Sequence, residues 1–227
     1  MIKHLAGTTL TRIIATGLGF LTIILAARAL GTEEYGNIGI FILTISLFQL
    51  ATGIAGGPAL VYLVPRKPLR VLFLVSLLWA VITHVAGFAI LTLVGMAEPW
   101  LPVALTVISF MVFMHIFSAT VLLGQNRIVE YNSVILLQAT TMLITLLIHL
   151  NFTPHPSFNI YLSSFLISQT ASAAFAWWLL RNSFTENQSG GFFSNFAETV
   201  RYGGFLQMAN GLQLLNYRLS FFLIDHY

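Results

Sequence analysis

The chain has 227 residues, of which 57% are hydrophobic and only 7% are charged. Soluble domains carry about 25% charged residues, so this composition excludes a water-soluble globular protein and makes the lipid bilayer the solvent for most of the surface. The absence of cysteine excludes disulfides and thiolate metal sites, and the net charge of +3 indicates membrane topology rather than binding to nucleic acid, which we do not expect.

Six apolar segments follow one another along the chain, each close to the roughly 20 residues that cross a bilayer. The N-terminal one loosely resembles a signal peptide with small residues at Ala26, Ala27 and Ala29, but its apolar stretch is long enough to span, which favours a retained helix. The predicted spans cover about residues 9–30, 37–64, 71–96, 101–123, 133–150 and 158–180.

A polar connector follows the sixth span. It contains RNSFTENQSGG and then FFSNFAETVRYGGF, which is typical of a short interfacial helix, and a seventh span begins near Phe205 and is cut short. We therefore expect an all-α integral membrane protein with a six-helix lobe over residues 1–180, a cytoplasmic connector over 181–204, and an incomplete first helix of a second lobe over 205–227.

The basic residues predict the orientation. With the N-terminus in the cytoplasm, nearly all of them fall on the inside, where lysine and arginine accumulate. The stretch GQNRIVEYN on that side could contact a phosphate head group or serve only as a topological anchor. The predicted inside set is Lys3, Arg12, Arg66, Lys67, Arg70, Arg127, Arg181 and Arg201.

The second span contains an unusual stretch, ATGIAGGPALVYLVPR. Gly53 and Gly57 form a pair of small residues four apart that permits close helix approach, and Pro58 removes one backbone hydrogen bond. The sequence supports two interpretations equally, a hinge that bends during transport and ordinary tight packing between helices.

The seventh span carries a polar stripe. At 100° per residue, Gln207, Arg218 and Asp225 project close together with Asn210 nearby, so this face should meet a cavity or another helix rather than lipid. Arg28 and Asp225 come late in helices that run in the same direction, which suggests an ion pair between them. Two separate interfacial charges are the alternative.

No enzyme signature is present. None of the seven acidic residues lies within the first six predicted spans, and no phosphate-binding glycine loop or HExxH pattern occurs. His84 and His115 fall near the middle of their spans, where they could relay protons but would more often bond to a neighbouring helix. We expect no catalytic residue, no metal and no cofactor.

Weak internal symmetry links the two ends of the chain. The separation of Gly7 from Gly204 equals that of Arg28 from Asp225, so the seventh helix begins where a second copy of the first helix would begin. Transporters are often built from two such halves with the substrate site between them. On this interpretation the chain ends just inside a second repeat.

Three motifs resemble a known family. ALGTEEYGNIGIF after the first span, ALVYLVPR closing the second and NYRLSFFLID in the seventh are similar to those of O-antigen and related repeat-unit flippases of the multidrug/oligosaccharidyl-lipid/polysaccharide exporter superfamily. The likeness covers the whole chain as the N-terminal half of such a protein. It implies two lobes forming a V around a central cavity, in which undecaprenyl-diphosphate-linked sugars cross the membrane by alternating access.

The resemblance also implies a set of substrate-binding residues. Cationic side chains in the cavity would hold the diphosphate or acidic sugars, and these would be Arg28 and Arg218, with Asp225 on the same stripe. Gln49, Gln207 and Asn210 would contact the sugar. The implied partners are a lipid-linked oligosaccharide, membrane lipids, and either a missing C-terminal lobe or a second copy.

The leading prediction is thus a lipid-linked oligosaccharide flippase of the cytoplasmic membrane. A cation-coupled multidrug exporter of the same superfamily is the alternative within transport, although its relatives use a buried carboxylate that the first six spans lack. A membrane enzyme of envelope assembly is disfavoured because the predicted outer loops are short and nearly uncharged. A truncated half that does not transport also fits the sequence.

Overall fold

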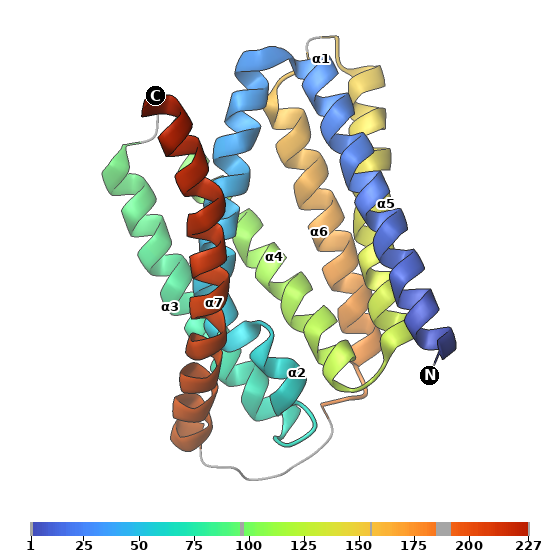
Figure 1. Ribbon diagram of the computed structural model, residues 1–227, viewed down its shortest axis with the longest axis vertical. Coiled ribbons are helices and arrows are strands. Elements are labelled where there is room, and N and C mark those ends of the chain that lie inside the picture. The colour runs from blue at the N-terminus through green and yellow to red at the C-terminus, as the bar shows by residue number, and fades with distance from the viewer. Residues whose placement is uncertain (1, 96–97, 155, 185–191, 227) are drawn as a thin grey trace.

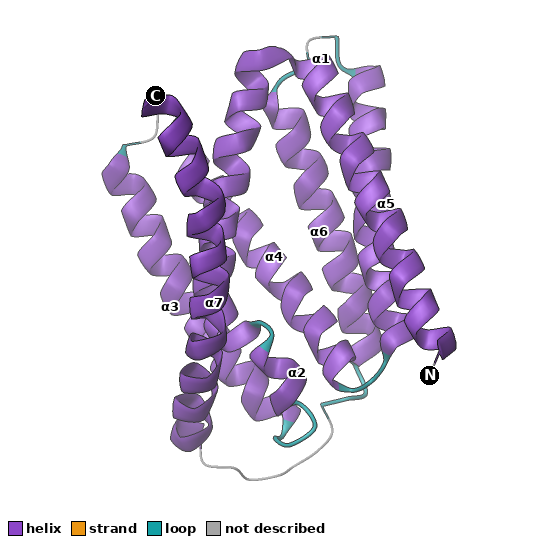
Figure 2. Cartoon of the chain, in the orientation of Figure 1, coloured by secondary structure: helices purple, strands orange, loops and turns teal. Residues whose placement is uncertain are grey.

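A computed structural model describes the backbone of residues 2–95, 98–154, 156–184 and 192–226, and the side chains of these ranges between Gly7 and Gln213. The described ranges contain seven helices and no strand, as the composition predicts (Figure 1; Figure 2). The helices are α1 (Ile2–Gly56), α2 (Ala59–Leu63), α3 (Leu69–Val94), α4 (Leu101–Gly124), α5 (Ile128–Phe152), α6 (Phe158–Leu180) and α7 (Phe192–His226).

Helix α1 is a hairpin rather than a straight rod. Its only non-helical residue is Gly31, with φ 80° and ψ 176°, a backbone conformation open essentially to glycine alone. Residues 2–30 form a first arm and residues 32–56 a second arm that runs back down the bundle (Figure 1). The two predicted spans are therefore present, but the predicted GTEEYG connection is reduced to one residue.

The turn at Gly31 is joined to α6 through Glu34. Its Oε2 atom accepts a hydrogen bond from the backbone N–H of Phe158 at 2.9 Å. Ser157, at the N-cap position of α6, makes no side-chain cap. A carboxylate at this end also complements the partial positive charge of the helix N-terminus, so a residue 124 positions away caps α6.

The second arm of α1 stops at the glycine and proline residues noted in the sequence. Pro58 has no N–H to continue the ladder, and the short α2 begins at Ala59. The backbone hydrogen bond that Pro58 cannot make thus coincides with a break between two helices. Beyond it, Leu60 and Leu63 of α2 are fully buried against α4.

Within the described residues, four helical stretches are long and apolar enough to cross a membrane. One of them contains both arms of α1 together with α2, so it covers the first two predicted spans. Helix α6, predicted as the sixth span, is not among the four. The stretches are Gly7–Leu63, Leu69–Val94, Leu101–Gly124 and Ile128–Phe152.

Helix α6 falls short because serines occupy its packed face. Ser164, Ser168 and Ser172, spaced four apart, are fully buried, and each hydroxyl donates to a backbone carbonyl of α6 itself. Small side chains let helices approach closely in a membrane. The packing face of α6 is therefore polar by composition yet buried between α4 and α5.

Two histidines on the neighbouring helices bond to this serine face. His115 Nδ1 of α4 lies 2.9 Å from Ser172 Oγ, and His149 Nδ1 of α5 lies 2.9 Å from Ser164 Oγ. Because each hydroxyl hydrogen already goes to the α6 backbone, the imidazole Nδ1–H is the donor in both pairs.

Apolar side chains form two clusters along the bundle. The first joins α2, α3, α4 and α6 with Val134 of α5, and the second joins both arms of α1 to α4, α5 and α6. The first cluster is rich in aromatic rings, with Phe117 stacked on Trp177 at a centroid distance of 6.1 Å. These clusters pack helices α1 to α6 into the body against which α7 lies.

The basic connections gather at one end of the body. The α2–α3 and α4–α5 connections, the C-terminal end of α6 and the N-terminal half of α7 all lie at the lower end in Figure 1, where the chain also starts. Most of the predicted inside residues fall in these segments. The described ranges place the predicted interfacial helix and the start of the seventh span in a single continuous helix, α7.

Candidate substrate pocket

A pocket of about 290 Å³ lies where the second arm of α1, α4 and α7 meet. It brings together six of the residues that the sequence singled out, from two stretches more than 140 positions apart. Gln49, Gly53, Gly57 and Pro58 come from the region of α1, and Gln207 and Asn210 from α7. The remaining lining residues are Ser46, Leu50 and Ile116.

Small residues allow the two helices to meet here. A Cβ atom on Gly53 would overlap the side-chain amide of Gln207, and one on Gly203 would overlap the backbone carbonyl of Ile54. About two turns after Gly203, a Cβ atom on Gly211 would lie at ordinary contact distance from the side chain of Leu50. The glycine pair of α1 therefore has a packing role, which is to admit Gln207.

Amide groups give the pocket its polarity. Asn210 Nδ2 donates to Gln207 Oε1 at 2.9 Å. Gln207 is 8% exposed, whereas Asn210 is exposed and Gln49 is half-buried. An amide both donates and accepts hydrogen bonds, and none of the described lining residues is charged. Such a pocket suits a neutral, hydroxyl-rich group better than a phosphate.

The predicted charged residues are not part of this pocket as described. Arg28 is exposed near the end of the first arm of α1, three positions before the Gly31 turn, and does not line the pocket. Arg218 and Asp225 belong to α7, but their side chains lie outside the described residues. The predicted Arg28–Asp225 pair is therefore also outside them.

Comparison with family models, with curated proteins and with solved structures found no match.

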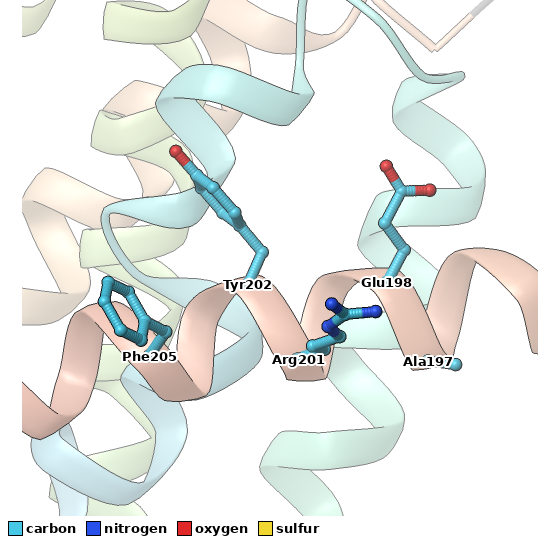
Figure 3. Close-up of a pocket in the computed structure, with 5 residues that line it drawn as sticks. All are labelled: Ala197, Glu198, Arg201, Tyr202 and Phe205. Atoms are coloured by element: carbon cyan, nitrogen blue, oxygen red, sulfur yellow. The ribbon is translucent and has the colours of Figure 1, made fainter.

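The N-terminal half of α7 is held by contacts that the sequence did not reveal. Figure 3 shows Glu198 and Tyr202 extending from the same side of α7. Both residues line a hollow of about 650 Å³. Glu198 forms an ion pair with Lys67 at 2.6 Å, and the Tyr202 ring stacks on Tyr62 at 4.9 Å. The Arg66 guanidinium lies 3.7 Å from the centre of the Tyr62 ring.

The two mid-span histidines do not bond to each other. His115 bonds to Ser172, while His84 Nδ1 bonds to the carbonyl of Ala80 on its own helix at 2.7 Å. The His84 ring is stacked on Phe48 with centroids 5.2 Å apart. His115 therefore bonds to a neighbouring helix, as predicted, whereas the hydrogen bond of His84 stays within α3. Within the described residues, no group of three or more potential metal ligands is found.

Two pocket residues could have been found from the sequence. Ser46 and Leu50 share the helical face of Gln49, Gly53 and Gly57, because positions three and four apart lie on one side of a helix. Ile116 had no such signal, since it comes from the middle of an apolar run on another helix.

Proposed function

We propose that this chain is the first lobe of a flippase that moves a lipid-linked oligosaccharide across the cytoplasmic membrane by alternating access. The observation that carries the proposal is the amide-lined pocket between the second arm of α1 and α7, in a bundle with helices long and apolar enough to cross a membrane. Sugar hydroxyls crossing hydrocarbon need such a polar path.

The location of the pocket supports transport rather than simple storage. It lies beside the Gly57–Pro58 break, where the backbone ladder of α1 ends and α2 begins. A break of this kind is a place where one helix segment can move relative to the next. Gly53, Gly57 and Pro58 are therefore proposed as the hinge.

The size of the pocket limits what it holds. At about 290 Å³ it is at the lower end of ligand pockets, which are roughly 300–1,000 Å³, so it would enclose one part of a larger ligand. In the proposal, Gln49, Gln207 and Asn210 contact a sugar, and the diphosphate lies elsewhere in a cavity with Arg28, Arg218 and Asp225. The N-terminus is proposed to face the cytoplasm with the basic connections.

The direct test is binding of an undecaprenyl-diphosphate-linked sugar to the purified chain in nanodiscs. Gln207→Leu removes both the donor and the acceptor of this side chain from the pocket and should weaken binding about 3- to 10-fold, the net value of about one hydrogen bond. Gln213→Leu, on an exposed position of the same helix outside the pocket, is the matched control. Equal binding by both variants, or no binding by the parent chain, would refute the proposal.

The alternative from the same superfamily is tested in parallel. A cation-coupled multidrug exporter would bind a lipophilic cationic dye in place of the lipid-linked sugar. Neutral amides offer such a cation no counter-charge, so we expect dye binding to be weak and insensitive to Gln207→Leu. Strong dye binding that this substitution abolishes would favour the alternative.

A further inference from the structure

A second cavity, of about 520 Å³, lies at the basic end of the molecule. It is enclosed by the α2–α3 connection on one side and the α4–α5 connection on the other, with the residues after α6 closing it. Its polar side chains are those of Arg66, Lys67, Gln125, Asn126 and Ser183. It shares no lining residue with the pocket at Gln207.

The electrostatic field at this cavity favours an anion. Arg66 and Lys67 contribute two cationic side chains to its wall. Helix α3 begins at Leu69, which lines the cavity, and α5 begins two residues after Asn126. Glu130 lies in the first turn of α5 and offsets the partial positive charge of that helix end. Helix α3 has neither a side-chain cap nor an acidic residue in its first turn, so the partial positive charge of its N-terminus adds to those of the side chains.

Hydrogen bonds organise the opposite wall. Arg127 donates to both carboxylate oxygens of Glu130, at 2.9 and 3.0 Å, and to the carbonyl of Leu179 at 3.0 Å. Gln125 Oε1 accepts from Arg127 and from Ser183, both at 3.4 Å. The side-chain carbonyl oxygen of Gln125 therefore already accepts hydrogen bonds. The side-chain NH₂ group, which only donates, is left to bind a ligand.

The position of the cavity along the helices favours a lipid head group as the source of the anion. Helices α3 and α4 are of membrane-spanning length and composition, and the cavity is lined by the first residue of α3 and the last residue of α4, Leu69 and Gly124. The ends of spanning helices lie at the level of the lipid head groups. The anionic group available at that level is a phosphate.

Glu198 of α7 does not line the cavity, but its carboxylate pairs with Lys67, which does. Its Oε2 atom lies 2.6 Å from Lys67 Nζ, with the two side chains 47% and 27% exposed. We propose that the cavity binds the phosphate of a membrane lipid head group, and that this phosphate competes with Glu198 for Lys67. Occupation of the cavity then removes one of the contacts that hold the N-terminal half of α7 to the body.

The test measures retention of dioleoyl phosphatidylglycerol by the purified chain in neutral detergent, using native mass spectrometry. Each basic residue near an anionic lipid contributes about a 5-fold gain in affinity, so Arg66→Gln with Lys67→Gln should weaken retention roughly 25-fold. Arg70→Gln is the matched control, because Arg70 is exposed at the same end and does not line the cavity. Its effect should stay below about 2-fold.

Glu198→Gln provides the second, opposite readout. Removing the competing carboxylate should tighten retention several-fold, a gain that damage to the fold would not produce. Unchanged or weaker retention in Glu198→Gln overturns the proposal, as does an Arg70→Gln loss as large as that of the double variant.

Competition with free phosphate distinguishes a lipid head group from soluble phosphate as the occupant of the cavity. Potassium phosphate and potassium chloride are compared at equal ionic strength as competitors of the bound lipid. Displacement by phosphate alone means that the head group is recognised by its phosphate and that soluble phosphate esters also occupy the cavity. No displacement by either salt, together with the variant effects above, assigns the cavity to lipid.

Discussion

Replacing Gly203 by alanine should loosen the crossing of α7 over α1, whereas the same replacement at the adjacent Gly204 should not. A Cβ atom on Gly203 would overlap the backbone carbonyl of Ile54, while a Cβ on Gly204 meets nothing within 4 Å. The obstacle at Gly203 is backbone, which cannot rotate away as a side chain can. Relief therefore requires α7 to move outward.

The size of the effect follows from two opposing terms. Overpacking of a close contact costs about 1–3 kcal/mol. Alanine in place of glycine within a helix gains about 0.5–1 kcal/mol, and this gain applies at both positions. The gain in helix stability from alanine is the same at both positions and cancels in the comparison. The two variants should therefore differ by about 1–3 kcal/mol, or roughly 5- to 150-fold, in the equilibrium for separation of α7 from α1.

The natural absence of cysteine gives a clean assay. Thr199 is 1% exposed and lies one turn before Gly203 on the same face of α7, so Thr199→Cys makes a buried reporter. Its rate of labelling by a small water-soluble thiol reagent measures how often α7 opens. Labelling should be at least 5-fold faster with Gly203→Ala than with Gly204→Ala. Equal rates would show that the close approach at Ile54 does not hold α7 in place.

Two further predictions concern the turn at Gly31. Gly31→Ala should lower the stability of the α1 hairpin by about 1–3 kcal/mol, because φ is 80° there. Gly36→Ala, in open space within the helix, should not lower it. Thermal unfolding in detergent compares the two variants. Glu34→Gln should speed hydrogen exchange of the Phe158 amide several-fold by weakening the cap on α6. Glu33→Gln, at the exposed neighbouring position, should leave the exchange rate of that amide unchanged. An equal response to both substitutions would contradict the cap by Glu34.

Hydropathy predicted the apolar helices well because span length and polar punctuation are local properties. The turn at GTEEYG, the break at Pro58 and the connection before α3 all lie where the sequence placed them. Helix α6 is the exception among the described spans. Its serines lower its hydropathy, and their burial depends on α4 and α5, which no pattern within α6 reports.

The candidate pocket was predicted in part. Gln207 and Asn210 stood out as amides on an apolar helix, and Gly53 and Gly57 as small residues four apart, so each half of the pocket had a local signal. That the two halves meet could not be derived, because the contact between Gly53 and Gln207 joins positions in separate helices. The same reason concealed the Lys67–Glu198 pair, whose partners are 131 positions apart.

The sequence by itself determined that this is an all-helical protein with helices suited to the membrane, that its chain reverses near Gly31, and that its basic residues cluster in alternate connections. Those features depend on composition and on neighbours a few positions away. Only the tertiary structure decided which helix faces meet, that Glu34 caps α6, and that Arg66 and Lys67 share a cavity with Gln125 and Ser183. Such contacts arise from the packing of whole helices, in which small side chains decide how closely two backbones approach.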